Sequence, residues 1–350
     1  MTPESAVTEL VNTPPAVPPF DIVRAALVEL QVTDLAASER FYSGLLGMIV
    51  SARTDEAVFL RGWEERQHHS LILRQCAPAR TVTASRLGFR VRTEADLDAA
   101  AAHFAGEGLA TRWTEAGSDP GMGRSLRVWD PFGYPLEFFH SLEQFDTQHQ
   151  RFDLHRGAPL LRFDHLNLHS PRVEAAFRFW LGLGFRCSEY ISTDDAATEQ
   201  ITGAWMLRKP TVHDVALTAG TGPRLHHFAY WVAEPGGVMR ACDQLAGGHH
   251  TDVIERGPGR HGVSNAFFVY LRDPDGHRIE LYSSDYYTGD PDHKPLRWSV
   301  NDPRCRSFYG TRAPDSWYEQ SSLLLGPDGE PVPTEPANVD ERAQHSEVAA

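Results

Sequence analysis

The sequence predicts an α+β protein of two tandem domains, built from four strand–helix–strands modules and followed by a C-terminal segment. Two repeated patterns support this fold class. A D-P-x-G turn followed by a short apolar strand occurs in "WDPFGYPLEFFHS" (129–141) and in "RDPDGHRIELYSS" (272–284). An alternating strand, a turn and an amphipathic helix that ends near Leu-Gly occur at 26–48 and again at 164–185.

The spacing between the two copies is nearly constant along the chain. Gly47 and Gly184 each end a predicted helix and are 184 − 47 = 137 residues apart. Asp130 and Asp273 open the two D-P-x-G turns and are 273 − 130 = 143 residues apart. Self-similarity at a fixed spacing indicates that one architecture is used twice.

Each copy also repeats within itself. "LGFRVRTEADLDAAAAHFAGEGL" (87–109) and "HHFAYWVAEPGGVMRACDQLAGG" (226–248) again read as a strand, a turn and a helix followed by glycine. Two modules in each copy, at 25–141 and 162–283, give the total of four.

The segments outside the repeats have a different composition. The N-terminus is rich in proline, residues 141–159 are polar and fit a linker, and the last 25 residues contain almost no large apolar side chains. The stretch after the second copy is rich in aromatic residues and arginine. We therefore expect a loose arm at 1–20, an N-terminal domain at 21–145, a C-terminal domain at 160–285, a lid or subunit-contact segment at 286–325, and a disordered tail at 326–350.

The bulk composition is that of an acidic globular protein. The chain has 350 residues, 41% apolar and 23% charged, with a formal net charge of −14, which argues against nucleic acid as a partner. Its four cysteines are widely spaced and form no C-x-x-C, so we expect a reduced, cytoplasmic protein. Neither a signal peptide nor a membrane-spanning run is predicted.

Alternation along the predicted strands places reactive side chains on defined faces. In "RFDHLNLHS", His165, Asn167 and His169 share one face. In "LHHFAYWV", His226 and His227 point in opposite directions, so we expect at most one of them to enter a given site.

Glu280 lies in the apolar strand of the second D-P-x-G repeat, where an unpaired carboxylate is costly to bury. Three strands of the C-terminal copy therefore offer one histidine, another histidine and one glutamate. Two imidazoles and a carboxylate on one face of a metal form the facial triad of non-haem Fe(II) oxygenases, and the same set suits Mn(II). A lone strand histidine is more often structural, but three such residues in a repeated module favour a metal site.

Four modules of this kind resemble the vicinal-oxygen-chelate superfamily, whose glyoxalase-like fold pairs βαβββ modules into a half-open cup. The two-domain arrangement is similar to the type I extradiol catechol dioxygenases over residues 20–320. Within the C-terminal copy, "GPRLHH", "IERGPGRHGVSNAF" and "DYYTGDP" occur in the order found in homoprotocatechuate (3,4-dihydroxyphenylacetate) 2,3-dioxygenases, which the chain resembles most.

The resemblance implies roles for particular residues of the C-terminal copy and of the segment after it. The implied sets are the metal ligands His165, His227 and Glu280; the catalytic residues His213, His261, Tyr270 and Asn167, with His213 as the acid–base histidine; and the substrate-binding residues Arg256, Arg306 and Trp205, with the arginines holding a carboxylate. His169 and His226 match no ligand of the family, and we expect them to be structural. The family often has two adjacent arginines where this chain reads "RCR", so Cys305 is a departure.

The N-terminal copy is expected to bind no metal. The residues aligned with His165 and His227 are Val28 and Arg86, and only the strand glutamate, Glu137, is retained. We expect the partner of Glu137 to be a guanidinium rather than a metal ion.

The resemblance implies extradiol (proximal) cleavage of a catechol by O2, with 3,4-dihydroxyphenylacetate giving a 2-hydroxymuconic semialdehyde. It also implies one Fe(II) or Mn(II) per chain, a small-molecule catechol with a carboxylate side chain, and a homo-oligomer, commonly a tetramer. The alternatives are another para-substituted catechol (a dihydroxybenzoate, dihydroxyphenylalanine or a hydroxycinnamate), a non-redox isomerase of the superfamily, and a protein that only binds a small molecule.

Overall fold

The computed structural model describes residues 5–14, 16–77 and 82–339. Its N-terminal copy contains two βαβββ modules, the first of which has a helix that continues into a π-helical turn. The elements are β1 (Ile22–Val32), α2 (Leu35–Glu39) with η1 (Arg40–Leu45), β2 (Ile49–Arg53), β3 (Ala57–Arg61), β4 (Leu71–Gln75), β5 (Thr83–Val91), α3 (Glu94–Gly106), β6 (Thr111–Thr114), β7 (Ser125–Trp129) and β8 (Pro135–Phe139).

The C-terminal copy repeats this order of elements. They are β9 (Arg162–Ser170), α4 (Val173–Gly182), β10 (Arg186–Ser192), β11 (Ile201–Leu207), β12 (Val215–Ala219), β13 (Arg224–Trp231), α5 (Pro235–Gly247), β14 (Ile254–Arg260), β15 (Phe267–Arg272) and β16 (Arg278–Ser283), with short 3₁₀ turns at Thr251–Val253 and Val263–Asn265. Outside the copies lie α1 (Ala6–Val11), β17 (Leu296–Ser299), α6 (Asp315–Glu319) and β18 (Leu323–Leu324). The predicted fold class of four βαβββ modules is confirmed.

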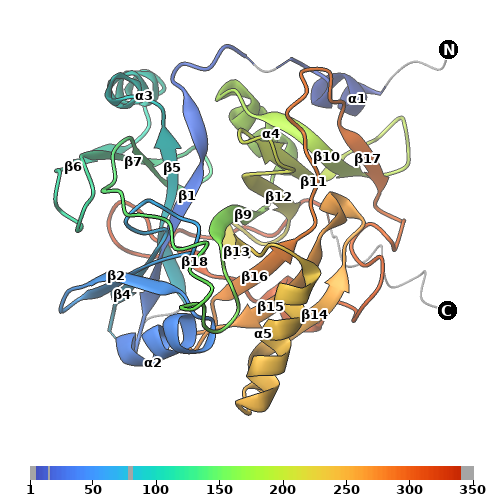
Figure 1. Cartoon of the computed structure of the whole chain (residues 1–350). Coiled ribbons are helices and arrows are strands. Elements are labelled where there is room, and N and C mark those ends of the chain that lie inside the picture. The colour runs from blue at the N-terminus through green and yellow to red at the C-terminus, as the bar shows by residue number, and fades with distance from the viewer. Residues whose placement is uncertain (1–4, 15, 78–81, 340–350) are drawn as a thin grey trace.

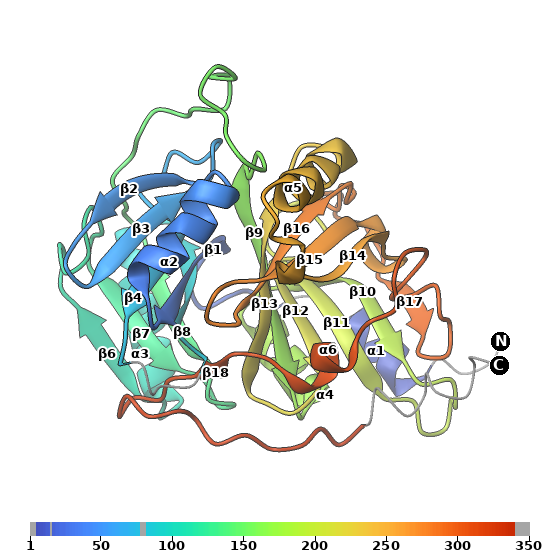
Figure 2. The same cartoon turned by 90° about the horizontal axis from the view of Figure 1, so that it is seen from below.

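The strands form two nine-stranded sheets that lie side by side (Figures 1 and 2). One sheet has the order β2-β3-β4-β1-β5-β8-β7-β6, with β18 beside β5, and the other has the order β14-β15-β16-β13-β9-β12-β11-β10-β17. In both sheets the two modules meet at their first strands, which pair antiparallel as β1 with β5 and as β9 with β13. The first strand of each module therefore lies near the centre of its sheet.

The two D-P-x-G repeats form the same turn. In each, the aspartate Oδ1 accepts two backbone N–H groups, at 2.9 and 2.9 Å for Asp130 and at 3.0 and 2.8 Å for Asp273. Gly133 and Gly276 both have φ of +95°, a conformation that favours glycine. The turns thus place β8 and β16, with their glutamates, at equivalent positions.

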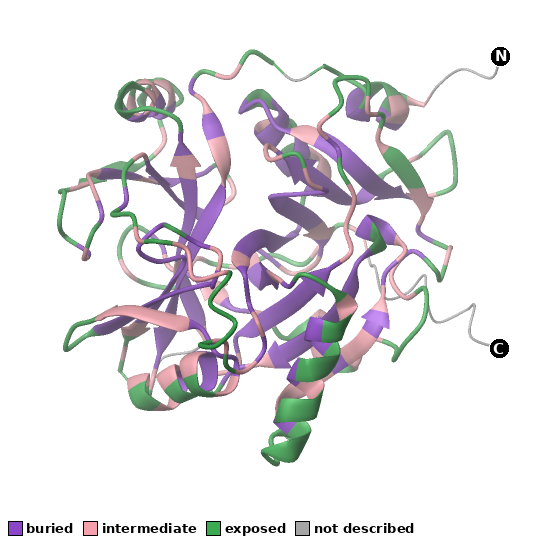
Figure 3. Cartoon of the chain, in the orientation of Figure 1, coloured by how far each residue is buried: buried purple, intermediate pink, exposed green. Residues whose placement is uncertain are grey.

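Reciprocal hydrogen bonds join the two copies. The Tyr134 hydroxyl donates to the carbonyl of His169 at 2.5 Å, and His277 Nε2 donates to the carbonyl of Gln31 at 3.0 Å. One continuous apolar core extends through both copies, and Figure 3 shows that the central strands are largely buried. The two copies therefore form one packed body.

The N-terminal arm is not loose over its described part. Residues of α1 pack on the C-terminal copy, where Ser5 Oγ donates to Glu199 and Val7, Leu10 and Val11 are buried (Figure 1). The first four residues lie outside the described chain.

The expectation of a disordered tail is wrong for residues 326–339. Val332 N–H donates to the carbonyl of Leu324 at 2.8 Å, and Glu335 N–H donates to that of Gly222 at 2.7 Å. Backbone hydrogen bonds to strand edges hold this segment, although it has few apolar side chains to bury. Residues 340–350 of the predicted tail lie outside the described chain.

The longest helices of the described chain, α3 and α5, have 13 residues each. Within that part of the chain, no helix has the length and apolar character needed to cross a membrane.

Candidate metal centre and substrate cavity

Three neighbouring strands of the C-terminal sheet bring the predicted ligands together. His165 comes from β9, His227 from β13 and Glu280 from β16, and all three side chains are buried. Glu280 Oε2 lies 3.0 Å from His165 Nε2 and 3.2 Å from His227 Nε2. The candidate ligand atoms all lie within 4.8 Å of one another.

The carboxylate of Asp164 orients the first ligand. His165 Nδ1 donates to Asp164 Oδ2 at 2.8 Å, which directs Nε2 toward Glu280. Burial raises the pKa of Asp164, but the nearby Lys209 and the hydrogen bond from His165 outweigh it and lower the pKa overall. The ionised carboxylate can only accept, so Nδ1 of His165 keeps its proton.

A second imidazole lies against the second candidate ligand. His227 Nδ1 lies 2.7 Å from His226 Nδ1, and His226 Nε2 lies 3.0 Å from the carbonyl oxygen of Trp317. Burial lowers the pKa of His226 well below its ordinary value, and it lowers that of His227 to about 4 despite the hydrogen bond to Glu280. Both rings are therefore neutral near pH 7.

The hydrogen-bond acceptors that converge between His165, His227 and Glu280 show whether the site suits a metal ion. With Nδ1 of His165 protonated, its Nε2 presents a lone pair to the Glu280 carboxylate, and His227 Nε2 does the same when its proton is on Nδ1, so that no proton lies between them. Glu280 Oε1 is buried and has no hydrogen-bond partner in the described part of the chain. Such an array repels itself unless a cation lies within it, and an N₂O set of this kind suits Fe(II) or Mn(II). His165, His227 and Glu280 therefore form a candidate site that could hold such an ion.

The electrostatics also favour a cation. Burial raises the pKa of Glu280, but His165 and His227, when they carry a proton toward the carboxylate, outweigh burial and hold the pKa far below its usual range. Burial lowers the pKa of His165, yet its bonds to Asp164 and Glu280 raise it overall. The site thus attracts positive charge, and a divalent ion competes there with a proton.

His213, two residues before β12, lies against the candidate metal site. Its ring centre is 3.9 Å from that of His165, and within the described chain its buried Nδ1 has no hydrogen-bond partner. Burial, with a smaller effect of His165, holds the pKa of His213 well below its ordinary value. A neutral imidazole with an unused lone pair can accept a proton in this cavity.

His261 and Tyr270 form a second hydrogen-bonded pair beside the metal site. His261 Nδ1 donates to the backbone carbonyl of Arg306, so its Nε2 accepts from the Tyr270 hydroxyl at 2.9 Å. Burial lowers the pKa of His261 to about 3 and raises that of Tyr270 well above its usual value. The tyrosine therefore stays protonated.

Arg256 and Arg306 line the same cavity. Arg256 Nη2 donates to the Arg306 carbonyl at 3.0 Å and to Ser307 Oγ at 2.7 Å, and its guanidinium carbon lies 4.5 Å from the Trp317 ring centre. No described carboxylate forms a salt bridge with Arg256. Its buried positive charge is therefore available to an anionic group in the cavity.

Trp205 lines an apolar wall of this cavity together with Ile191 and Val263. Cys305 is buried behind that wall, in the same apolar cluster. The Cys305 thiol does not line the cavity. The presence of Cys305, where the family often has an arginine, therefore affects packing behind the wall.

Eight lining residues were not predicted as part of the site: His169, Ile191, Thr218, His226, Val263, Ser264, Tyr282 and Trp317. His226 and His227 both line the cavity because the pairing of β13 with β9 shifts register between Leu225 and His227, and this bulge breaks the strict alternation of faces. The expectation that at most one of them enters the site was wrong.

Thr218 Oγ1 donates to Asn167 Oδ1 at 2.9 Å, which leaves the amide NH₂ as a donor. An ordinary strand threonine gave no signal for this contact.

Comparisons with known proteins agree with the site. The model of the glyoxalase/bleomycin resistance protein/dioxygenase superfamily matches residues 24–138 and 162–281. The manganese-dependent 2,3-dihydroxybiphenyl 1,2-dioxygenase of Geobacillus genomosp. 3 is 31% identical over 297 residues, which are 81% of this chain and 91% of that protein. This chain is an extradiol dioxygenase of that superfamily.

Solved structures are similar to this extradiol dioxygenase over nearly its whole length. The homoprotocatechuate 2,3-dioxygenase of Arthrobacter globiformis is 44% identical, with a TM-score of 0.87 over 91% of this chain and 98% of that chain. The enzyme of that name from Brevibacterium fuscum, in complex with 3,4-dihydroxyphenylacetate, is 43% identical, with a TM-score of 0.87 over 92% of this chain and 99% of that chain.

Strand register shows which residues of the two copies of the dioxygenase correspond. Opposite the glutamate, β5 carries Gly88 and β13 carries Ala229. Leu27 pairs with Gly88 and His165 pairs with Ala229, so Leu27 takes the place of the first ligand. The expected match to Val28 was wrong by one residue, because the path from the first strand to the end of the helix is one residue longer in the N-terminal copy.

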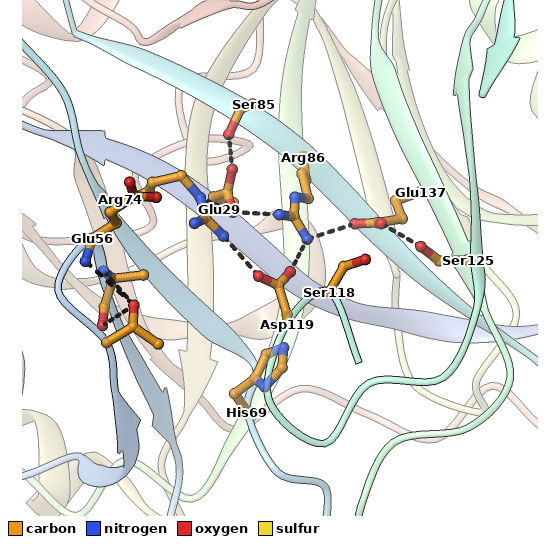
Figure 4. A network of polar contacts seen from close by, with 12 residues as sticks. Glu29, Glu56, His69, Arg74, Ser85, Arg86, Ser118, Asp119, Ser125 and Glu137 are labelled. Carbon is orange, nitrogen blue, oxygen red and sulfur yellow. Dashed lines mark hydrogen bonds and ion pairs between the residues drawn. The ribbon is translucent and has the colours of Figure 1, made fainter. Parts of the chain in front are cut away.

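The same register places Arg86 at the position of His227. Arg86 Nη1 lies 3.4 Å from Glu137 Oε2, its Nη2 lies 2.9 Å from Glu29 Oε2, and it also contacts Asp119 (Figure 4). The prediction that a guanidinium is the partner of Glu137 is confirmed. Arg74 bridges Glu29 and Asp119 at 2.9 and 2.8 Å, which extends the network.

A histidine is also common to both copies. β4 pairs with β1 at Leu71, β12 pairs with β9 at the equivalent Val215, and His69 and His213 each stand two residues earlier. The His69 side chain is buried against the charged network of the N-terminal copy (Figure 4). It provides a matched control for experiments on His213.

Proposed function

We propose that this extradiol dioxygenase cleaves 3,4-dihydroxyphenylacetate, or a close para-substituted catechol with a carboxylate, at the bond beside the diol. The product is a 2-hydroxymuconic semialdehyde that retains both oxygen atoms of O2. One observation carries the substrate class: a cavity with an N₂O metal site also contains Arg256, whose buried charge is matched by no described carboxylate. The complex of the Brevibacterium fuscum relative with 3,4-dihydroxyphenylacetate supports the proposal.

The metal ligands would hold one Fe(II) or Mn(II) per chain, which lowers the pKa of a catechol hydroxyl and brings the ring and O2 together. His213 accepts the proton of the second hydroxyl at its free nitrogen and later returns a proton to oxygen. The Tyr270 hydroxyl, oriented by His261, and the Asn167 amide, oriented by Thr218, supply fixed hydrogen-bond groups at the reacting oxygens. Trp205 positions the ring.

The two arginines act at the other end of the substrate. A guanidinium matches a carboxylate in a planar, two-bond geometry, so Arg256 and Arg306 fix the distance of the diol from the arylacetate group. Because such charged hydrogen bonds contribute about 1.5–3 kcal/mol, kcat/KM should be about 10–100-fold higher for 3,4-dihydroxyphenylacetate than for catechol.

The test is anaerobic loading with Fe(II) or Mn(II), then addition of O2 to a panel of catechols with and without a carboxylate, followed by absorbance of the yellow product. Cleavage of carboxylated catechols supports the proposal. The absence of product from every catechol would contradict ring cleavage, whereas equal kcat/KM with and without the carboxylate would contradict the substrate assignment.

A second experiment tests the acid–base role of His213. His213→Phe should retain metal but lose turnover by about 10²–10⁴-fold, the contribution typical of positioned proton transfer. His69→Phe, at the corresponding position of the N-terminal copy, should keep wild-type turnover. Full activity of the His213 variant would exclude the assigned role.

The proposal includes a cytoplasmic homo-tetramer. Tyr287, Phe308 and Tyr309 in the segment after the second copy are 66%, 56% and 52% exposed, which suits a lid edge or a subunit contact. Analytical ultracentrifugation measures the oligomeric state, and metal analysis measures the number of ions per chain.

A further inference from the structure

We propose that His226 is a positioning residue for the metal ligand His227, and that the backbone carbonyl of Trp317 fixes the proton positions in both rings. The C-terminal segment would then be part of the metal site as well as a cover over it. The inference rests on the proposed metal-dependent function, but it concerns ligand orientation and can be tested without turnover.

The argument begins at the carbonyl oxygen of Trp317, which can only accept a hydrogen bond. His226 Nε2 lies 3.0 Å from it and must therefore carry the proton. In the Nδ1–Nδ1 contact with His227 one nitrogen must donate and the other accept, and with the ring proton of His226 on Nε2 its Nδ1 is the acceptor. It lies 2.7 Å from His227 Nδ1, so His227 carries its proton on Nδ1. The Nε2 lone pair of His227 is left to face Glu280 and a metal ion.

The opposite arrangement is unfavourable at the Trp317 carbonyl, and at the other end it closes the metal position. A proton on His226 Nδ1 would set its Nε2 lone pair against the Trp317 carbonyl, so two acceptors would lie 3.0 Å apart. His227 would then carry its proton on Nε2 and donate to Glu280, which would block the metal position. Because a buried acceptor without a donor is costly, the carbonyl favours the metal-binding tautomer over the one in which His227 donates to Glu280.

Arg278 holds α6, which carries Trp317, against β13. Its Nη1 donates to the His226 carbonyl at 3.0 Å, and its Nη2 donates to the Ser316 carbonyl at 3.1 Å. The Arg278 guanidinium carbon also lies 4.8 Å from the Trp317 ring centre, and the Trp317 ring centre lies 4.3 Å from that of His226. These contacts restrict the movement of the carbonyl relative to the imidazole.

The same device recurs at His261. Its Nδ1 donates to the carbonyl of Arg306, another backbone group of the C-terminal segment, and this leaves Nε2 to accept from Tyr270. Two carbonyls of one segment thus set two imidazoles beside the metal site. Closure of this segment over the cavity therefore also sets the hydrogen-bond directions inside it.

The first measurement is the tautomer of His227 in the metal-free protein labelled with ¹⁵N-histidine, read from long-range ¹H–¹⁵N spectra. Wild type should show His227 protonated on Nδ1. In His226→Phe this preference should be lost, since the ring no longer offers an acceptor. A wild-type His227 protonated on Nε2 would overturn the inference.

The second measurement is Mn(II) affinity at constant pH by competition with a chelator. His226→Phe should lower the affinity about 10–100-fold, the usual effect of removing a group that orients a ligand. His226→Asn keeps an oxygen acceptor near the Nδ1 position and should bind more tightly than His226→Phe. Wild-type affinity in His226→Phe would overturn the inference.

His169→Phe is the matched control for packing. Its ring lies 4.4 Å from that of His226, and the three ligands of the proposed site do not include it. Equal loss of affinity in His169→Phe and His226→Phe would assign the effect to packing and overturn the positioning role. If the wild-type protein binds Mn(II) but cleaves no catechol, the proposed function fails while this inference stands.

Discussion

The N-terminal and C-terminal copies bury a glutamate at the same point of the same strand, yet they neutralise it differently. Glu280 faces two imidazole nitrogens at 3.0 and 3.2 Å, in an array that needs an added cation. Glu137 has the guanidinium of Arg86 at 3.4 Å and accepts from Ser125 Oγ at 2.7 Å. The fold therefore determines where a carboxylate is buried, and the residues at the two ligand positions determine which cation compensates it.

The residues behind the ligand positions differ as well. In the C-terminal copy Asp164 and His226 direct the imidazoles toward the metal. The register places Ala26 and Ser85 at these positions in the N-terminal copy. The N-terminal copy thus lacks the ligands and also the groups that would orient them.

The largest expected effect separates the two glutamates. Glu280→Gln removes the charge of the triad and should weaken Mn(II) binding by more than about 100-fold, because loss of groups that only orient ligands already costs 10–100-fold. Glu137→Gln should leave the affinity unchanged. Competition with a chelator measures the Mn(II) affinity of both variants. Retention of metal by Glu280→Gln, or its loss from Glu137→Gln, would contradict the division of roles between the copies.

Arg86 should matter for stability and not for metal content. Arg86→Met leaves the carboxylates of Glu29, Asp119 and Glu137 with less positive charge and should lower the free energy of unfolding by about 3–5 kcal/mol. Urea unfolding measures this loss. Arg92→Met, which removes an exposed pair with Asp21, should leave the free energy of unfolding close to that of wild type. A small loss of unfolding free energy in Arg86→Met would show that the charge of Arg86 does not hold the N-terminal copy together.

The contribution of the charged network around Arg86 to the free energy of unfolding should depend on pH. Burial raises the pKa of Asp119, but Arg86 and Arg74 outweigh it and hold the pKa below the usual 3.8. Its stabilising effect is therefore present above pH 3.8 and is lost as the pH falls through the lower, folded-state pKa. Asp119→Asn should lose about 1–3 kcal/mol at pH 7, with the difference from wild type shrinking below pH 4. A difference that stays constant between pH 7 and 3 would rule out this linkage.

The smallest effect would come from grafting ligands onto the N-terminal copy. Leu27→His with Arg86→His places two imidazoles at the positions of His165 and His227, beside Glu137. Metal titration should rise from one to two ions per chain, with the new site about 100-fold weaker because nothing orients the new rings. A folded double variant that still binds one ion would show that the copies differ by more than their ligands.

Much of this comparison could be predicted from local patterns. The D-P-x-G turns, the glycines after the helices and the alternation along strands revealed the repeat, because turn geometry and strand faces depend on nearby residues. His165, His227 and Glu280 were predicted as ligands, and Arg86 was predicted as the partner of Glu137. The match of Leu27 to His165 required strand register, since helix-end spacing differs by one residue.

Other features arose only in the tertiary structure. The bulge at His226 depends on how β13 pairs with β9, and the orientation of His226 depends on a carbonyl of Trp317, 91 residues along the chain. A backbone carbonyl has no residue identity that a sequence pattern could reveal. The sequence by itself determined the repeated fold and the ligand set, because these depend on residue type and local geometry. Only the tertiary structure decided where the protons lie, because that depends on which acceptor the packing of the C-terminal segment brings to each ring.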